Sequence, residues 1–349
     1  MKEIKPTLRD IAKRTDLTTA SVSMILSGKM LSRFPQETIE KVERCAQELG
    51  YVSKQKKKAA PLILIVCPSV INPYFATLLQ GMESAADNEH WNTIIANTYW
   101  SKEREEKIIN MAKGQNIQGV IFAMIPQQPE LVVELSALKP VIVVGDKQST
   151  VNLDTVDVDN FNAGFELGRY LIDLGHRHIV YLSTALNKEH TSRVFRLSGL
   201  KASFKEFCPE GKVDIIICDV SYKTEIDNVE IEHTTGQELA SRFLAQKSDA
   251  TAIVAINDMI AYGVLDELKS RGYKIPEDYS VCGFDNIYPS KFIDLELTTV
   301  DQFINNKGES AFNLIKERIL STSPKHSTTH VEFASQLVVR KTTAPPKAR

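Results

Sequence analysis

From residue 62 onward, short runs of apolar and β-branched residues alternate with longer amphipathic stretches. Near-continuous apolar strands separated by helices are typical of a parallel sheet that helices cover on both faces. The alternation therefore predicts an α/β fold with doubly wound parallel sheets. We expect strands at 62–67, 93–96, 119–124, 141–144, 178–182, 215–218, 252–255 and 280–284, and helices at 76–89, 102–115, 162–174, 196–207, 234–246 and 258–271.

The number of these units limits how they are arranged. A chain of 349 residues is too long for one small domain. The eight expected strands are more than one doubly wound sheet usually holds, so two α/β subdomains are expected. In that arrangement the carboxyl ends of the strands face a shared cleft, which is where such sheets bind ligands.

The N-terminal segment differs from this body in charge and in pattern. Residues 1–58 hold 13 Lys and Arg against 7 Asp and Glu, whereas the remainder holds 29 against 37. A small basic head on a larger acidic body indicates a head that meets a polyanion, although a chance surface bias gives the same counts. Three short helices are expected in it, from the apolar spacing of Leu8, Ile11 and Ala12, of Val22, Ile25 and Leu26, and of Ile39, Val42, Ala46 and Leu49.

The turn between the first two of these helices is Thr15-Asp16-Leu17-Thr18. A short turn before a helix rich in small hydroxyl residues is the pattern of a helix-turn-helix, whose second helix, here residues 19–27, lies in the major groove. The alternative is a three-helix bundle with no ligand. Short outward side chains let the backbone approach base edges, and hydroxyls donate to phosphates. The candidate DNA-contacting residues are Thr7, Thr18, Thr19, Ala20, Ser21, Ser23, Met24, Ser27, Lys29, Tyr51 and Lys54.

Three runs of residues in the head carry a resemblance to a known family. They are Thr7-Leu8-Arg9-Asp10-Ile11-Ala12, Ala20-Ser21-Val22-Ser23-Met24-Ile25-Leu26-Ser27 and Glu48-Leu49-Gly50-Tyr51. Together they resemble the head of the LacI/GalR family of bacterial transcription repressors. Met24 stands where the family usually has an arginine. An apolar contact, for example to a thymine methyl, therefore replaces the bidentate hydrogen bonds of an arginine to guanine. Pro35 stands where the family commonly has a capping serine.

A short basic connector, residues 53–61, separates the head from the first expected strand. Its four lysines at positions 54–58 would repel one another in isolation and favour a phosphate backbone, but a solvated linker has the same composition. In the family, a longer segment folds here into a hinge helix that wedges a leucine into the minor groove. This chain has no leucine between Val52 and Pro61, so whether a hinge helix forms is left open.

The body carries further motifs of the same family. They include Asn72-Pro73-Tyr74-Phe75, Gly164-x-x-x-Gly168-Arg169-Tyr170-Leu171, Arg196-Leu197-Ser198-Gly199-Leu200 and Asn257-Asp258-x-x-Ala261-x-Gly263. The resemblance runs over most of residues 7–340 and implies a periplasmic-binding-protein-like type I fold, in which the chain crosses three times between its subdomains. The expected domains are a helix-turn-helix head (1–52), a basic linker (53–61), an effector-binding and dimerisation domain (62–340) and a C-terminal tail (341–349).

The resemblance also places a set of side chains at strand ends that face the cleft. They suit a small polar ligand, because aromatic faces cover the C–H surface of a sugar or purine while Asp, Asn and Arg satisfy its hydroxyls or amides. Alternatives are open for three of them: Phe75 as core, Asp258 as a helix cap and Asp285 as a brace for a turn. The candidate effector-binding residues are Tyr74, Phe75, Asp146, Arg196, Asn257, Asp258 and Asp285.

The sequence lacks the common signatures of an enzyme or a metal site. It contains no Gly-x-Gly-x-x-Gly, no Gly-x-x-x-x-Gly-Lys-Ser/Thr and no Gly-x-Ser-x-Gly, so we expect no catalytic residues and no cofactor. His176 and His178 would alternate sides of a strand rather than pair on a metal. Asp154, Asp157 and Asp159 lack the glycine-centred loop of a calcium site, and a solvated edge or turn is the favoured interpretation.

Membrane and secreted proteins are disfavoured as classes. The longest apolar stretches have six residues, far short of the roughly 18 that cross a bilayer. The N-terminus is polar and shows no signal-peptide core. The five scattered cysteines form no Cys-x-x-Cys motif, so we expect reduced thiols in the cytoplasm.

Together these features predict a ligand-controlled, sequence-specific DNA-binding transcription regulator, a repressor of carbohydrate-related genes, rather than an enzyme. Its expected partners are double-stranded operator DNA, a small-molecule effector such as a sugar or sugar derivative, and a second copy of the chain in a homodimer that reads two half-sites. The alternative is a solute-binding protein without a DNA function, which shares the body but needs a signal peptide and no basic head.

Overall fold

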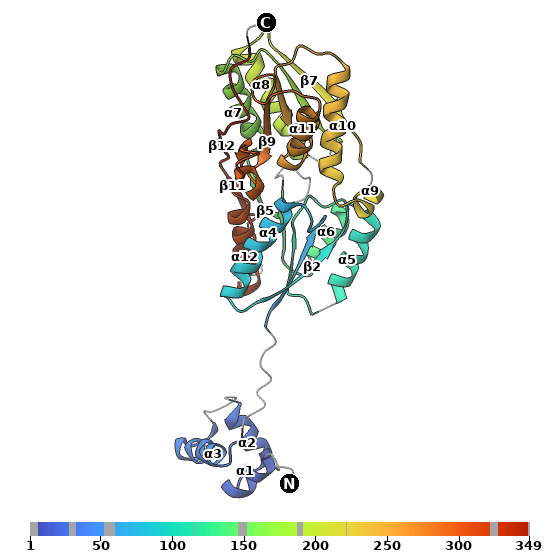
Figure 1. Ribbon diagram of the computed structural model, residues 1–349. Coiled ribbons are helices and arrows are strands. Elements are labelled where there is room, and N and C mark those ends of the chain that lie inside the picture. Colours follow the sequence, from blue (N-terminus) through green and yellow to red (C-terminus); the bar gives the residue numbers. More distant parts are fainter. Residues whose placement is uncertain are drawn as a thin grey trace. The chain divides into compact units, whose positions relative to one another are not determined.

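The computed structural model describes residues 6–27, 33–51, 60–114, 116–145, 152–186, 191–220, 222–321 and 327–347 (Figure 1). The chain divides into two compact units, Met1–Ala60 and Pro61–Arg349, which we call the head and the body. Of the expected connector 53–61, only residues 60 and 61 fall within the described ranges.

Within its described residues, the head is a bundle of three helices. α1 (Leu8–Thr15) begins after Thr7, whose N–H donates to the Asp10 carboxylate at 2.7 Å in a capping box. α2 (Thr19–Leu26) and α3 (Gln36–Glu48) follow, where the apolar spacing predicts helices. The cluster that joins the three is formed by Ile11, Ala12, Val22, Ile25, Ile39, Val42, Cys45 and Ala46, all buried.

The body has two lobes, each built on one sheet. In lobe A the strand order is β11-β5-β4-β3-β1-β2, and every neighbouring pair is parallel. Its strands are β1 (Leu62–Cys67), β2 (Asn92–Asn97), β3 (Gly119–Phe122), β4 (Val141–Val144), β5 (Asp154–Val158) and β11 (His330–Phe333), and its helices are α4 (Pro73–Asn88), α5 (Lys102–Gly114), α6 (Pro129–Ser136) and α12 (Ile304–Leu320).

In lobe B the strand order is β12-β10-β9-β8-β6-β7, parallel except for the antiparallel pair of β12 and β10. The strands are β6 (His178–Ser183), β7 (Lys212–Ile217), β8 (Ala252–Ala255), β9 (Ser280–Asp285), β10 (Thr298–Asp301) and β12 (Gln336–Val338). Its helices are α7 (Asn160–Asp173), α8 (Thr191–Phe207), α10 (Ile231–Ala245) and α11 (Asp258–Ser270), with the short α9 (Tyr222–Asp227) between β7 and α10 and a 3-10 turn at Tyr288–Lys291.

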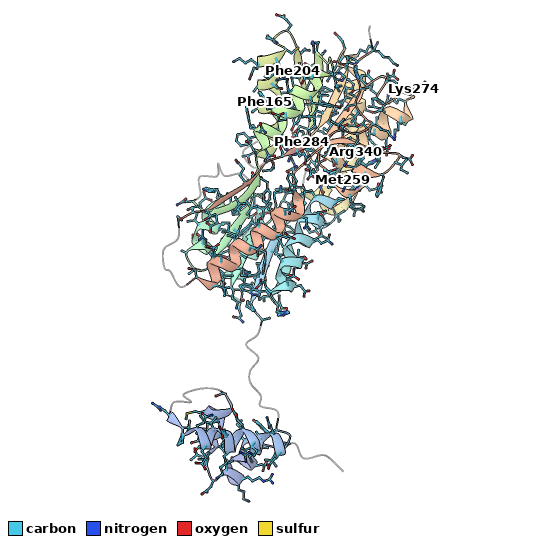
Figure 2. All side chains as sticks on the ribbon, turned by 90° about the vertical axis from the view of Figure 1, so that its left-hand side faces the viewer. Phe165, Phe204, Met259, Lys274, Phe284 and Arg340 are labelled. Atoms are coloured by element: carbon cyan, nitrogen blue, oxygen red, sulfur yellow. The ribbon has the colours of Figure 1, made fainter. Side chains whose placement is uncertain are left out.

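One apolar cluster extends through both lobes. It includes Ile63 and Ile65 of β1 in lobe A, and Val254 and Phe284 of lobe B, all without exposed surface. Figure 2 shows the side chains that fill both lobes, among them Phe204 and Phe284 of lobe B. Helices pack in pairs over the sheets, α4 with α12, α7 with α8 and α10 with α11. Burial of this cluster stabilises each lobe, and its close packing fixes the positions of the residues at the strand ends.

The chain crosses between the lobes three times, which confirms the fold that the resemblance implies. The crossings lie between β5 and α7, between β10 and α12, and between β11 and β12. The first and third are joined directly, because the Asp159 N–H donates to the Phe333 carbonyl at 3.3 Å. Short connections of this kind let two lobes rotate relative to each other.

Part of the expected secondary structure is wrong. The eight predicted strands are present, but the described residues hold twelve. The solvated edge or turn expected at Asp154, Asp157 and Asp159 is instead a strand, β5, between β4 and β11, followed by the cap of α7, where Asp159 accepts from the Asn162 N–H at 2.9 Å. The strand accommodates its first acid because Arg318 pairs with Asp154 at 2.6 Å.

The remaining elements that the pattern does not predict are β10, β11, β12, α6, α9 and α12. The three strands have only three or four residues each, too few for a clear apolar run. Across the described ranges, no helix has both the length and the apolar character needed to span a membrane.

Candidate functional site

Helix α2 presents its small polar side chains outward. Val22 and Ile25 are 0% and 2% exposed and hold the helix against α1 and α3, with the partly buried Leu26 beside them. The opposite face carries exposed Thr18, Thr19, Ala20, Ser23 and Ser27, while Ser21 and Met24 are half-buried. The helix is therefore available along the face that the sequence predicts for DNA.

Two of the predicted hydroxyl donors also stabilise the helix. Thr18 Oγ1 accepts from the Ser21 N–H at 3.1 Å, which caps α2. The two hydroxyl oxygens lie 2.9 Å apart, so one hydroxyl proton is shared between them and the other stays available for an outside acceptor. The pair can cap the helix and still donate to a phosphate.

The other predicted head residues differ in placement. Thr7 is exposed at the start of α1, and its hydroxyl donates to Asp10 at 2.7 Å. Tyr51 is half-buried and packs against the apolar cluster of the head, with its N–H bonded to the Ala46 carbonyl. Lys29 and Lys54 lie outside the described residues.

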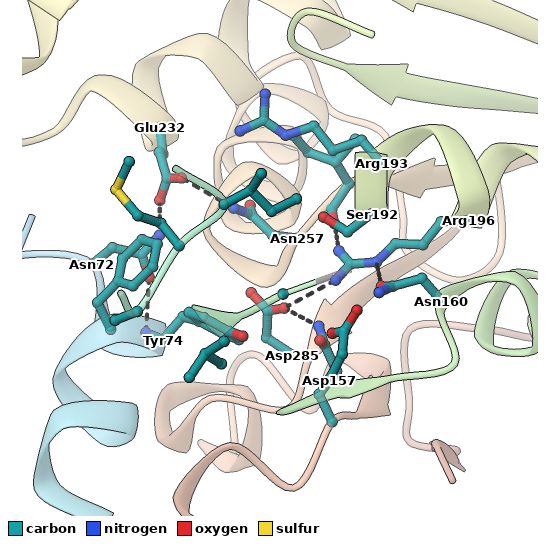
Figure 3. A pocket seen from close by; sticks show the side chains of 18 of the residues that line it. Asn72, Tyr74, Asp157, Asn160, Ser192, Arg193, Arg196, Glu232, Asn257 and Asp285 are labelled. Atoms are coloured by element: carbon teal, nitrogen blue, oxygen red, sulfur yellow. Dashed lines mark hydrogen bonds and ion pairs between the residues drawn. The ribbon is translucent and has the colours of Figure 1, made fainter. Parts of the chain in front are cut away.

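A pocket of about 140 Å³ lies between the lobes of the body (Figure 3). Pockets for drug-sized ligands are roughly 300–1,000 Å³, so this one suits a small molecule. Both lobes contribute to it: Asn72, Tyr74, Phe75, Trp100, Ala123, Met124, Ile125, Val144, Gly145 and Asp157 come from lobe A, and Asn160, Ser192, Arg193, Arg196, Glu232, Ile256, Asn257, Asp285 and Gln302 come from lobe B and the crossings.

The aromatic wall of the pocket comes from the start of α4. Asn72 caps this helix by accepting from the Tyr74 N–H at 2.8 Å, and Pro73 is its first residue. Tyr74 and Phe75 meet edge to face with ring centroids 5.1 Å apart. Both line the pocket and both are half-buried, so Phe75 is not simply a core residue.

Arg196 is buried at the pocket, 7% exposed, and its guanidinium joins separate parts of the body. It donates to Asn160 Oδ1 at 2.9 Å and to the Ile256 carbonyl at 2.6 Å, and lies 4.0 Å from Asp285. The expected helix start at this residue is wrong, because α8 begins at Thr191. Arg196 therefore projects from within a helix, and the rigid fork of donors fixes several partners at once.

Asp285 ends β9 in a strained conformation, with φ 124°. It accepts a hydrogen bond from Gln302 Nε2, and burial raises the pKa of its carboxyl well above the usual value, an effect that Arg196 opposes. Lys307 lies behind this pair, 1% exposed, with its ammonium 2.9 Å from the Tyr74 hydroxyl and 3.4 Å from Gln302 Oε1. A polar network thus runs from the aromatic wall to Asp285 through the second crossing.

Asp258 does not line this pocket, in contrast to its predicted role. It is the first residue of α11 and has no exposed surface. Its carboxylate accepts from Ser290 Oγ at 2.6 Å and from the Ile287 N–H at 3.1 Å, and also from Thr299. These donors hold it beneath the ends of β9 and β10. The alternative role as a cap is also wrong, since Asn257 caps α11 by accepting from the Ile260 N–H at 2.9 Å.

Asn257 lines the pocket as predicted, whereas Asp146 lies outside the described residues. Sequence reasoning missed Trp100, Asp157, Gln302 and Glu232 as lining residues. The first three lie at or just after the ends of β2, β5 and β10, so the rule that ligands bind at strand ends finds them once β5 and β10 are recognised. Glu232 lies in the first turn of a helix, and no simple pattern marks it.

The comparison with known families covers most of this body. Residues 60–337 match the sequence model of the family described as periplasmic binding proteins and sugar binding domain of the LacI family. The chain belongs to this family. Its LacI-family membership agrees with the two-lobed fold, the three crossings and a pocket between the lobes.

Relatives extend the similarity over the head. The chain is 27% identical over 346 residues to the HTH-type transcriptional repressor PurR of Histophilus somni (strain 129Pt), covering 96% of this chain and 98% of the relative. It is 26% identical over 325 residues to the HTH-type transcriptional repressor CytR of Escherichia coli (strain K12), covering 91% of each. These LacI-family relatives are transcriptional regulators rather than enzymes.

Among solved structures, the chain is similar to a LacI family transcriptional regulator from Enterococcus faecium with bound ribose. The identity is 26%, the TM-score is 0.69, and the match covers 81% of this chain and 99% of that one. That regulator shows a sugar bound to a protein of this fold and family.

Proposed function

We propose that this LacI-family chain is a sequence-specific DNA-binding transcriptional repressor whose affinity for DNA is set by a small polar effector. The observation that carries the proposal is the outward face of α2, where Thr19, Ala20 and Ser23 are exposed while Val22 and Ile25 are buried. A helix with short outward side chains lies readily in the major groove. The similarity to repressors along almost the whole chain supports the same role.

In the proposed complex, the residues of α2 divide by chemistry. Thr19, Ser23 and the Thr18–Ser21 pair donate to phosphates and position the helix without reading sequence. Met24, half-buried at the edge of this face, makes an apolar contact to a base, such as a thymine methyl. Thr7, Ser27, Lys29, Tyr51 and Lys54 complete the proposed DNA-contacting set.

The proposed effector is a sugar or sugar derivative held in the pocket between the lobes. Tyr74 and Phe75 offer apolar faces to its C–H surface, and Arg196, Asn257 and Asp285 offer hydrogen bonds to its hydroxyls. Asp146 belongs to the proposed set from the sequence resemblance alone. The ribose held by the Enterococcus faecium regulator supports this class of ligand.

The proposed assembly is a cytoplasmic homodimer whose two heads read two half-sites of a near-palindrome. We place its head at 1–52, its linker at 53–61, its effector and dimerisation domain at 62–340 and its tail at 341–349. The effector shifts DNA affinity only by binding one arrangement of the lobes more tightly than another.

Selection from a random duplex library tests the proposed function. The full chain is mixed with the duplexes, and the bound fraction is sequenced over several rounds. We expect enrichment of one near-palindromic sequence. A solute-binding protein enriches no sequence, and that outcome contradicts the proposal.

A thermal-shift screen against sugars, sugar phosphates and nucleobases then tests the effector. A ligand at 100 times its dissociation constant adds roughly 2.7 kcal/mol to stability, which moves the unfolding midpoint by several degrees. A shift produced by sugars supports the proposed class, and a shift produced by nucleobases alone contradicts it.

A further inference from the structure

Glu232 lies at the end of the pocket away from the first crossing. Figure 3 shows Glu232 and Asn72 at one end, with Asp157 and Asn160 at the other. We infer that Glu232 is a clasp residue that joins the lobes at this end of the pocket and offers its remaining acceptor positions to donor groups of the effector. The effector half of this inference rests on the proposed function, whereas the clasp does not.

The clasp consists of one carboxylate and two amides. Glu232 projects from the first turn of α10 in lobe B. Its Oε2 accepts from Asn72 Nδ2 of lobe A at 2.5 Å, and its Oε1 accepts from Asn257 Nδ2 of lobe B at 3.1 Å. The carboxylate therefore joins residues 185 positions apart in sequence and on opposite sides of the cleft.

Both amides are held in orientation by the helices that they cap. The Asn72 side-chain oxygen accepts from the Tyr74 N–H at 2.8 Å, and the Asn257 side-chain oxygen accepts from the Ile260 N–H at 2.9 Å. Because each oxygen is engaged in a cap, each amide group presents its NH₂ to the carboxylate. Glu232 thus links the N-cap residues of α4 and α11, two helices that belong to different lobes.

The same carboxylate recognises the effector by its acceptor chemistry. A carboxylate has about four acceptor positions, and the two amides use one on each oxygen. Glu232 lines the pocket, so in the proposed complex the remaining positions accept from hydroxyl or N–H groups of the effector. A sugar satisfies these positions with its hydroxyl donors, whereas a phosphate only accepts and leaves them unsatisfied. Glu232 therefore favours hydroxyl groups at this end, against the attraction that Arg193, a cation of the same pocket, has for an anion.

Hydrogen exchange of the effector-free full chain tests the clasp. Asn72→Ser and Asn257→Ser both keep a capping hydroxyl, but the first removes the bond between lobes and the second removes a bond within lobe B. A hydrogen bond to a charged group is worth roughly a tenfold change in an opening equilibrium. We expect Asn72→Ser to speed exchange about tenfold in peptides around both Asn72 and Glu232, and Asn257→Ser to act in lobe B alone.

The clasp is overturned if Asn72→Ser speeds exchange in α4 but not around Glu232. It is also overturned if Asn257→Ser speeds exchange in lobe A as much as in lobe B. Each variant is first checked for an unchanged far-ultraviolet circular dichroism spectrum, which shows that it has folded.

Calorimetric titration with D-ribose and D-ribose 5-phosphate tests the effector half. We expect the wild-type chain to bind ribose more tightly than ribose 5-phosphate. Glu232→Gln should bind ribose about tenfold more weakly than wild type, and the ratio of its affinities for the two compounds should be smaller. Equal ribose affinity in Glu232→Gln and wild type overturns this half alone. A wild-type chain that binds neither compound also overturns this half, while the thermal-shift screen decides the proposed effector class and the exchange result decides the clasp.

Discussion

At the scale of single residues, Arg196 is the side chain on which the pocket most depends. It contacts Asn160 next to the first crossing, the carbonyl of Ile256 at the end of β8 and the strained Asp285 at the end of β9. Its guanidinium also lies over the ring of Phe284, 4.7 Å from the centroid. One buried cation therefore fixes the ends of β8 and β9 relative to the first crossing between the lobes.

We predict that Arg196→Ala loses its response to the effector while DNA binding by the head is nearly unchanged. The substitution removes the donors that organise the pocket, whereas α2 belongs to a separate compact unit. Fluorescence anisotropy of a labelled operator, with and without effector, measures both properties. Arg169→Ala is the matched control, since Arg169 is an exposed arginine of α7 that pairs with Asp173. Loss of DNA binding in Arg196→Ala would assign this residue a structural role instead.

His176 links Ala344 to lobe B as a neutral side chain. Its Nε2 lies 3.1 Å from the Ala344 carbonyl, which only accepts, so Nε2 carries the proton and Nδ1 accepts from Thr251 Oγ1 at 2.8 Å. Burial lowers the pKa of His176 to about 4. The unfolded chain protonates a histidine near pH 6.5, so acid favours unfolding at this site.

The contribution of His176 to stability is therefore full above about pH 6.5 and is lost as the pH falls toward 4. We predict that the free energy of unfolding of wild type, relative to His176→Gln, decreases over this range. Urea unfolding at a series of pH values measures the difference. His90→Asn, at an exposed histidine, should follow wild type at every pH. Parallel curves for wild type and His176→Gln would contradict the prediction.

At the scale of elements, the pairs of helices that cover the sheets pack through glycines. A Cβ on Gly164 of α7 would lie 2.0 Å from the Arg196 carbonyl, and one on Gly199 of α8 would lie 2.0 Å from the Phe161 carbonyl. The two helices therefore approach backbone to backbone. This contact also fixes the helix that carries Arg196.

We predict that Gly199→Ala lowers the free energy of unfolding by about 1–3 kcal/mol, because the added methyl group forces the helices apart. Gly114→Ala at the end of α5 is the matched control: a Cβ there meets nothing within 4 Å. That control should be neutral or stabilising by up to about 1 kcal/mol. Equal calorimetric midpoints for the two variants would show that α7 and α8 have room for the added methyl group.

Helix α2 carries the prediction for sequence preference. Met24→Arg should replace an apolar base contact by a guanine-directed fork and change the preference by ~1–3 kcal/mol at one position of each half-site. A panel of operators with single base substitutions measures this change. An unaltered ranking across the panel would place Met24 away from the bases.

The helices and strands with long apolar patterns could be predicted from sequence, and the short or charged ones could not. β1, β4 and β8 have the predicted bounds because their apolar runs are uninterrupted. β5 is not predicted because its aspartates interrupt the apolar pattern. These acids are stabilised by partners far away in the chain, such as Arg318. Asp258 is expected in the pocket from the sequence and Glu232 is not, whereas Glu232 lines the pocket and Asp258 does not. Only tertiary contacts decide which carboxylate reaches the pocket.

At the scale of the whole molecule, the chain combines a basic head with an acidic body. The separation of charge favours contact of the head, rather than the body, with DNA. The three crossings join the two lobes, and the polar network around Arg196 and Asp285 lies at the pocket that we propose for the effector. A ligand that binds one arrangement of the lobes more tightly shifts the equilibrium between the arrangements by that difference in binding free energy.

The affinity of the full chain for its selected duplex, measured by anisotropy between 50 and 200 mM salt, tests most directly whether α2 binds DNA. With 6–10 phosphate contacts, wild type should lose about 10³–10⁵-fold in affinity over this range. Ala20→Asp places an acid in the first turn of α2, where it favours the helix but faces phosphates, and should weaken binding about 100-fold at low salt. Binding by Ala20→Asp that equals wild type, with little dependence on salt, would contradict this role for α2.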